Sequence, residues 1–345
     1  MKYLSDRALL RLREGADLPD LAGTRYRLLG QIARGGMGVV YAAEDETLER
    51  RVALKVLEVP GNESELADRL LREARVLAVL EHPGIVPVHD VGTLADGRVF
   101  YTMKFVEGQR LDQHIASVPS IPDRLRLFLR ICEAVAFAHA RGVLHRDLKP
   151  ANVMVGPFGE VLVMDWGLAK ILSAASQSAE ASTDSAPTLF QTKPTASADD
   201  AATEITKVTG HGTVMGTPGY MSPEQARGDI ESLDARSDIF SLGALMRFLL
   251  TAKSSDAVQP PAARPDRPLE SICAKATAPT PAERYASVQD LARDVSRYLD
   301  GLAVAAHRES ILDKSFRFYR RYRFFILLIL AYLLMRTLLL VFLKR

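Results

Sequence analysis

Cysteine and net charge are both scarce in this sequence of 345 residues. Its two cysteines, Cys132 and Cys273, stand too far apart for a disulfide framework or a zinc site, so buried thiols in a reducing compartment are expected. A formal net charge of +2 argues neither for nor against nucleic acid. The first twenty residues have no apolar core, so they predict no signal peptide but a short amphipathic helix, packed on the body or free on the surface.

A long apolar run is present at the other end of the chain. Residues 324–343, FFILLILAYLLMRTLLLVFL, would extend about 30 Å as a helix, which matches the hydrocarbon core of a bilayer. The alternative is a buried core helix, but such a helix normally carries a polar stripe, and this run has only Arg336 and Thr337. We therefore expect one transmembrane helix, which serves as a tether or also drives homodimerisation.

Basic residues flank this run unequally. Two follow it, Lys344 and Arg345, whereas more precede it: Lys314, Arg317, Arg320, Arg321 and Arg323. The positive-inside rule then places the body of the protein on the cytoplasmic side of the cell (inner) membrane. The sequence predicts a single-pass protein whose basic juxtamembrane segment, 301–323, and C-terminal helix contact membrane lipids.

The body changes along its length from strand-like to helical patterns. Residues 26–59 alternate as antiparallel strands do, 63–83 has helical spacing, and two further strand-like runs, 84–92 and 98–108, follow. Beyond Gly108 the pattern is mostly helical. This order predicts an α+β fold with an N-terminal extension (1–25), a small sheet lobe with its hinge (26–106) and a larger helical lobe (107–300).

Three features of the body stand out. Glu73 lies within the apolar stripe of the predicted helix, and an inward carboxylate needs a cationic partner. Residues 172–209, rich in Ser, Thr, Ala and Asp, predict a disordered insertion in the second lobe. The stretch VLVMDWGLAK, 161–170, is either a buried strand ending in an ordinary turn or a carboxylate delivered to a metal.

A glycine-rich segment, ARGGMGVVY at 33–41, is a weak signal by itself. A dinucleotide-binding loop would need a helix after its glycines, and a Walker P-loop would need Gly-Lys-Ser/Thr; neither is present. A glycine-rich hairpin that folds over phosphates remains. Four motifs then follow in order: VALK ending at Lys55, HRDLKPANV at 145–153, MDWG at 164–167 and GTPGYMSPEQARG at 216–228.

Together these motifs resemble the two-lobed protein-kinase fold, specifically the bacterial eukaryotic-like Ser/Thr kinases, over about residues 26–300. The resemblance implies ATP and Mg²⁺ as cofactors, with Mn²⁺ as an alternative ion, protein substrates and no nucleic acid. Lys55, paired with Glu73, would hold the α- and β-phosphates. Asp147 would accept the proton of the substrate hydroxyl, and Lys149 would steady the γ-phosphate.

The resemblance also implies ligands for the metal and the nucleotide. Asn152 and Asp165 would supply hard oxygens to Mg²⁺. Met103 would be the gatekeeper and the backbone of Lys104–Val106 the hinge. The residues expected at the nucleotide are Ile32, Ala33, Gly35, Gly36, Gly38, Val40, Ala53, Lys55, Met103, Lys104, Val106 and Met154.

Other positions would have architectural or regulatory roles. Asp238 would anchor the catalytic loop, and Glu224 would pair with Arg284. Trp166 would stack between His145 and Leu77. A basic pocket at Arg146 would receive a phosphate from the activation segment, with Thr209 and Thr213 as the expected autophosphorylation sites.

Three departures from the family pattern bear on function. Ala33 replaces the first glycine of the loop, 249–269 is short and proline-rich where the family has a longer connection with a substrate-docking helix, and the stretch from Asp165 to Glu224 carries a longer Ser/Thr-rich insertion than usual. In addition, Trp166 stands where the family usually has a phenylalanine. The competing hypothesis is a pseudokinase scaffold that binds nucleotide or partners without catalysis. The presence of Lys55, Glu73, Asp147, Asn152 and Asp165 favours the active kinase.

Overall fold

The computed structural model describes residues 18–35, 38–57, 64–166, 170–171, 217–229, 232–252, 266–307 and 324–336. Several predictions lie outside these ranges: the N-terminal helix, Gly36, the insertion 172–209, Thr209 and Thr213. Residues 253–265 of the proline-rich stretch 249–269 also lie outside these ranges, so the expected change at the substrate-docking helix stays a prediction.

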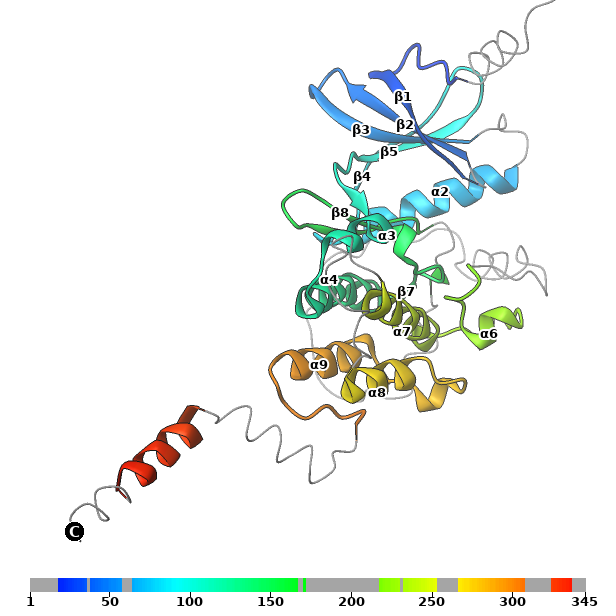
Figure 1. Ribbon diagram of the computed structural model, residues 1–345. Coiled ribbons are helices and arrows are strands. Elements are labelled where there is room, and N and C mark those ends of the chain that lie inside the picture. The colour runs from blue at the N-terminus through cyan, green and yellow to red at the C-terminus, as the bar shows by residue number, and fades with distance from the viewer. Residues whose placement is uncertain are drawn as a thin grey trace, which may run out of the picture.

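The N-terminal lobe is a five-stranded antiparallel sheet with one helix, α2, against it (Figure 1). The strands lie in the order β1-β2-β3-β5-β4. Their alternating apolar residues bury one face of the sheet, as the period of two requires. The elements are β1 (Tyr26–Gly35), β2 (Gly38–Asp45), β3 (Arg50–Val56), α2 (Ser64–Val79), β4 (Val88–Thr93) and β5 (Val99–Lys104).

Helix α2 turns an apolar stripe toward the sheet. Leu70, Ala74 and Leu77 are at most 4% exposed, at the spacing that places residues on one helix face. Glu73, in the same stripe, is 3% exposed, so the predicted inward carboxylate is confirmed. Helix packing therefore carries a charge into the interior beside β5.

The C-terminal lobe is mainly helical and is built around α4, which α7 and α9 contact (Figure 1). Phe128, Ile131 and Val135 of α4 are fully buried. The helices are α3 (Leu111–His114), α4 (Ile121–Ala140), α6 (Pro223–Ala226), α7 (Ala235–Thr251), α8 (Arg267–Ala276) and α9 (Val288–Leu299), with 3₁₀ turns η1 (Ile115–Ser117), η2 (Pro150–Asn152) and η5 (Pro281–Glu283).

Short strands fix the loops between the lobes. One three-stranded sheet has the order β6-β8-β9, and β10 pairs with β7. Because these strands flank the HRDLKPANV and MDWG motifs, they hold both motifs at one edge of the helical lobe. Their bounds are β6 (Gln109–Arg110), β7 (Val143–Leu144), β8 (Val153–Val155), β9 (Val161–Val163) and β10 (Lys170–Ile171).

The segment that follows α9 is hydrogen-bonded to that helix. Asp294 of α9 is buried and accepts hydrogen bonds from the backbone N–H groups of Ala305 and Ala306, at 2.7 and 2.9 Å, and from the hydroxyl of Tyr285. A further helix covers 324–336. No helix within the described residues has the length and apolarity needed to cross a membrane, and 337–343 of the predicted span lie outside them.

Candidate active site

The two lobes meet at a cationic side chain from the sheet. Lys55, on β3, places Nζ 2.8 Å from each carboxylate oxygen of Glu73 on α2, which confirms the predicted ion pair. The same Nζ lies 3.9 Å from Oδ1 of Asp165 in the MDWG motif. Both side chains of the pair are nearly buried, and the contact with Asp165 links the N-terminal lobe to the metal-ligand candidate.

Asp147 lies at the centre of a polar cluster in the catalytic-loop motif. Lys149 Nζ donates to its Oδ2 at 2.6 Å, and the Thr217 hydroxyl donates to its Oδ1 at 2.9 Å. Lys149 also contacts Thr217 Oγ1 at 2.6 Å, which closes a three-membered network. Asn152 donates its amide to the backbone oxygen and Oδ2 of Asp147. The arrangement leaves Asp147 a fixed, hydrogen-bonded carboxylate that can accept a proton.

Asp238, at the start of α7, holds the backbone of this loop. Its carboxylate accepts hydrogen bonds from the N–H groups of His145 and Arg146, at 2.9 and 2.8 Å, and from His139 Nε2 at 2.8 Å. Burial would raise the pKa of Asp238, but the hydrogen bond and charge of His139, the charge of His145 and the N–H group of Arg146 outweigh it, so the pKa is lowered. The predicted anchoring role is confirmed, and Gln225 Nε2 adds a bond to the Arg146 carbonyl.

Two non-glycine residues of the site have left-handed backbone conformations. Arg146 has φ of 69° and Asp165 has φ of 57°. Such conformations are uncommon outside glycine and are held here by the surrounding contacts. Asp165 begins the turn of the MDWG motif, and its side chain is 53% exposed, so its carboxylate faces the space beside Lys55.

The ring of Trp166 packs beneath this turn. It is 1% exposed, its centroid is 4.6 Å from that of His145, and Leu77 of α2 belongs to the same buried cluster. His145 Nε2 in turn contacts the carbonyl oxygen of Met164 at 2.9 Å. The predicted contact with His145 is present, although the two rings are tilted by 50° and do not stack in parallel. Gly167, the expected pivot, lies outside the described residues.

Asn152 and Asp165, at the edge of the helical lobe, are suited to a divalent cation that the phosphates of a nucleotide also coordinate. Asn152 uses its amide nitrogen on Asp147, so its amide oxygen is the atom left for a metal. Asp165 adds a carboxylate oxygen. Mg²⁺ binds through one or two such ligands plus substrate phosphates. No cluster of three or more acidic, His or Cys ligands occurs in the described part of the chain.

Most of the predicted nucleotide residues lie on neighbouring strands of the N-terminal sheet. Val40 is paired in register with Lys55, and Ala53 with Met103. Ala53 and Met103 are buried, Val40 and Met154 are partly buried and pack on the same core, and Lys104 closes β5. Ile32 and Ala33 lie on the exposed part of β1, and Val106 follows the hinge residue Phe105. The sheet thus brings together residues that lie far apart in the sequence.

Position 38 requires glycine for a structural reason that is independent of nucleotide binding. Its φ is 147°, and a Cβ there would lie 2.2 Å from the backbone oxygen of Val56. At Gly35 a Cβ would meet only the Gly38 oxygen at 3.9 Å. Close approach of β2 to β3 therefore requires glycine at 38, independently of any phosphate.

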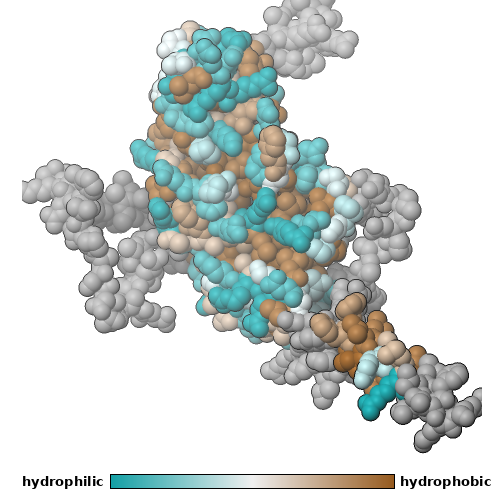
Figure 2. Space-filling view, turned by 90° about the vertical axis from the view of Figure 1, so that its left-hand side faces the viewer, coloured by the Kyte–Doolittle hydropathy of each residue, from teal (hydrophilic) through white to brown (hydrophobic). Residues whose placement is uncertain are grey.

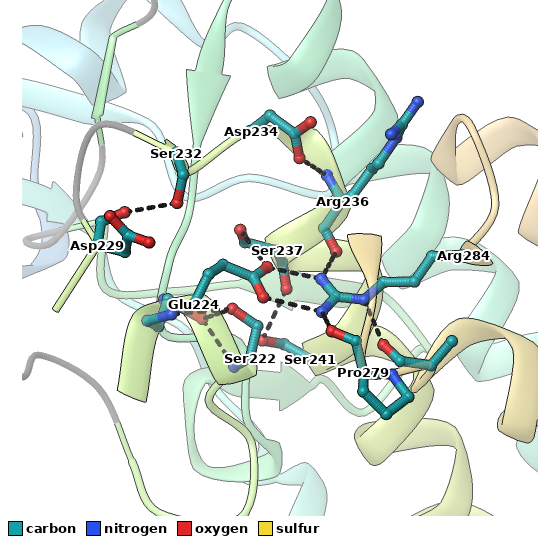
Figure 3. Close-up of polar contacts among 12 residues, drawn as sticks. Ser222, Glu224, Asp229, Ser232, Asp234, Arg236, Ser237, Ser241, Pro279 and Arg284 are labelled. Atoms are coloured by element: carbon teal, nitrogen blue, oxygen red, sulfur yellow. Dashed lines mark hydrogen bonds and ion pairs between the residues drawn. The ribbon is translucent and has the colours of Figure 1, made fainter. Parts of the chain in front are cut away.

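The Glu224–Arg284 pair lies in the C-terminal lobe beside the start of α7 (Figure 3). Arg284 donates to both oxygens of Glu224, at 2.6 and 2.8 Å, and Ser237 donates to Oε1 at 2.9 Å. This confirms the predicted pair. It fixes α6, directly after the Thr217 segment, to the start of α7.

Sequence reasoning missed two contacts. Thr217 was noted only as part of its motif, and its bond to Asp147 crosses 70 residues, so only the folded segment shows it. Tyr101 was not singled out, yet its hydroxyl donates to Glu73 at 2.8 Å. Its placement opposite Lys55 depends on strand register, which residue spacing alone does not give.

Comparisons with known proteins agree with this geometry. The family model for the protein kinase domain matches residues 26–295. The serine/threonine-protein kinase PknD of Protochlamydia amoebophila is 36% identical over 315 residues, and PknD of Chlamydia trachomatis serovar D is 37% identical over 310. These alignments cover 80% of this chain but 30% and 32% of those proteins, so the chain spans about a third of their length.

A solved structure is similar as well. The kinase domain of PknI from Mycobacterium tuberculosis has a TM-score of 0.55 and 26% sequence identity, covering 81% of this chain and 96% of that one. The match therefore extends over both lobes.

Proposed function

Because this chain belongs to the protein kinase domain family, we propose that it is an active serine/threonine protein kinase that transfers the γ-phosphoryl group of ATP to protein hydroxyls. One observation carries the proposal. Asp147 is held by Lys149, Thr217 and Asn152 while the Lys55–Glu73 pair is formed. Phosphoryl transfer requires positioning and charge neutralisation, and this arrangement supplies both.

The roles follow from the donors and acceptors present. Lys55 has three N–H donors and uses two on Glu73, which leaves the third for the nucleotide phosphates. Asp147 orients the substrate hydroxyl and accepts its proton, while Lys149 steadies the γ-phosphoryl oxygens. Asn152 and Asp165 would hold Mg²⁺, which when bound neutralises phosphate charge.

An ATP/Mg²⁺ phosphorylation assay tests this proposal. The full chain should label itself and a generic acceptor protein such as casein, and Asp147→Asn should lower the rate by at least about a hundredfold, the usual contribution of a general base. Incorporation no greater than in Asp147→Asn, with nucleotide binding retained, would instead establish the pseudokinase scaffold.

The activation segment is the proposed site of autophosphorylation. Arg146 is 9% exposed, and its Nε has no hydrogen-bond partner among the described residues. Burial lowers the pKa of Arg146, a cost that a phosphate partner would offset. Thr209→Ala/Thr213→Ala should lower the rate toward substrates, whereas Thr183→Ala/Thr188→Ala, in the same insertion, should not. Equal rates in both variants would refute this assignment.

The proposed location is the inner membrane, with the kinase domain cytoplasmic. The described helix 324–336 exposes large apolar side chains, among them Phe324, Leu328 and Met335 at 56–70% (Figure 2). Exposed apolar surface of this extent requires a lipid or protein cover. The full chain should sediment with membranes after an alkaline wash, and deletion of 324–345 should release it. Crosslinking both forms would separate a tether from a dimerisation helix.

A further inference from the structure

We propose that Tyr101 is a positioning residue for phosphoryl transfer: its hydroxyl holds Glu73, and with it helix α2, where Lys55 can receive the nucleotide phosphates. This inference rests on the proposed kinase function and deepens it. Tyr101 lies on β5, two residues before the gatekeeper candidate Met103. It belongs to none of the motifs that identify the active site.

Tyr101 contacts both members of the ion pair. Its hydroxyl is 2.8 Å from Glu73 Oε1, and Lys55 Nζ lies 5.7 Å from the centroid of its ring. Tyr101 and Lys55 are register partners on adjacent antiparallel strands, so their side chains share one face of the sheet. The residue is 2% exposed. Sheet pairing therefore fixes the phenol where α2 presents its carboxylate.

The direction of the hydrogen bond follows from the groups involved. An ionised carboxylate only accepts, so the phenol is the donor. Burial and the neighbouring Glu73 raise the pKa of Tyr101 well above its ordinary value, so the donor proton is kept at any working pH. A phenylalanine would fill the same ring volume and remove only this donor.

Nucleotide binding explains why a second donor matters. The lysine must divide its N–H groups between Glu73 and phosphates, and Asp165 already lies 3.9 Å from its nitrogen. Tyr101 is neutral and donates to Glu73 alone among its described contacts. It therefore keeps α2 in place while Lys55 is shared.

This role has a distinct kinetic signature. Without Tyr101, a smaller fraction of molecules would hold α2 inward before nucleotide arrives. A lower competent fraction weakens the apparent affinity in proportion, whereas saturating ligand restores the population. The expected defect thus lies in KM for ATP and not in kcat.

The test compares Tyr101→Phe with Tyr26→Phe in the full chain. Tyr26 is also a buried tyrosine of this lobe, and its hydroxyl contacts Asp90 and Thr102 away from the ion pair. Tyr101→Phe should raise KM for ATP about tenfold or more with kcat within about twofold, as expected for losing a hydrogen bond to a charged group. Tyr26→Phe should lower thermal stability and leave KM unchanged.

Two further readouts do not depend on turnover. Hydrogen exchange in α2 should be faster in Tyr101→Phe without nucleotide and return to the parent rate with saturating ATP and Mg²⁺. In a Glu73→Gln background, Tyr101→Phe should change the Kd for ATP, measured by calorimetry, less than about twofold.

Several results would overturn the proposal. They are an unchanged KM and α2 exchange rate in Tyr101→Phe, a lower kcat at unchanged KM, and an equal rise in KM for Tyr26→Phe. Failure of the kinase function is separate, since the parent chain would then incorporate no phosphate while exchange and calorimetry still report on Tyr101.

Discussion

Two buried ion pairs, one in each lobe, join the same kinds of charge but differ in how completely they are bonded. The Lys55 and Glu73 side chains are 12% and 1% exposed, and those of Arg284 and Glu224 are 0% and 3% exposed. Burial is thus similar. What differs is the number of acceptors around each cation.

Every N–H of the Arg284 guanidinium has an acceptor. Besides Glu224, it donates to the carbonyl oxygens of Arg236 and Pro279 (Figure 3). It also donates to the carbonyl oxygen of Ala278. Among the described residues, Lys55 instead has one donor that meets no acceptor closer than Asp165 at 3.9 Å. A saturated pair fixes structure, whereas an unsaturated pair can bind a ligand. We expect the first to determine stability and the second activity.

Breaking the saturated pair should have the largest effect. Arg284→Met leaves Glu224 buried without its cation, which costs about 3–5 kcal/mol of unfolding free energy. Urea denaturation measures this. The control is Arg293→Met, whose pair with Asp290 is exposed and should contribute less than about 1 kcal/mol. Similar losses in the two variants would show that saturation and burial do not govern the stability of this lobe.

Removing Lys55, the cation of the unsaturated pair, should lower the activity. Lys55→Met should lower kcat/KM by about a hundredfold or more, about 2.7 kcal/mol of transition-state stabilisation. The free energy of unfolding should fall by less than half of the Arg284→Met loss, because Arg284→Met also removes hydrogen bonds to three backbone carbonyl oxygens, whereas the Lys55 hydrogen bonds go to Glu73. Arg51→Met, on an exposed position of the same strand, is the control. Equal destabilisation by Lys55→Met and Arg284→Met would remove the distinction between the pairs.

The saturated pair should also make the free energy of unfolding depend on pH in the acidic range. Burial would raise the pKa of Glu224, but hydrogen bonds from Arg284, its own backbone and Ser237 outweigh it and lower the pKa from 4.5 to about 2. A depressed pKa means that the unfolded state binds protons first. This contribution is therefore complete above pH 4.5 and is lost as pH falls toward 2. Urea midpoints across that window should converge for the parent and Glu224→Gln; parallel curves would contradict the assignment.

The fold was largely predictable because its signals are local. Period-two alternation predicted the antiparallel strands of residues 26–59, and the leucine spacing predicted α2 with Glu73 inward. Strands followed by helices indicated the two lobes. An inward Glu73 needs a cationic partner, and the resemblance to the kinase family implied that this partner is Lys55 and that Glu224 pairs with Arg284; the structure contains both pairs.

The remaining contacts could not be predicted, because they depend on where distant segments come to lie. The Thr217 hydroxyl reaches Asp147 only after the activation segment folds back, and Tyr101 reaches Glu73 only through the β3–β5 register. The requirement for glycine at 38 likewise arises from the carbonyl of Val56 on the neighbouring strand. Spacing within one segment has no information on any of these.

The smallest expected effect concerns Trp166, which acts by packing beneath the Asp165 turn and not by charge. Trp166→Phe removes the larger ring and the indole N–H, which lies 3.4 Å from the Val163 carbonyl oxygen, while a phenyl ring can still contact His145. Stability should fall by about 1–2 kcal/mol. The activity should fall about two- to threefold, with faster hydrogen exchange at the turn that holds Asp165, because the smaller ring admits other arrangements of that turn. Phe128→Leu, a fully buried change in α4, should match the stability loss without altering exchange at the turn. Unchanged activity and exchange in Trp166→Phe would show that the size of the ring is incidental. The position of Lys55 in the unsaturated pair would then depend on Glu73 and Tyr101 alone, without a contribution from this packing.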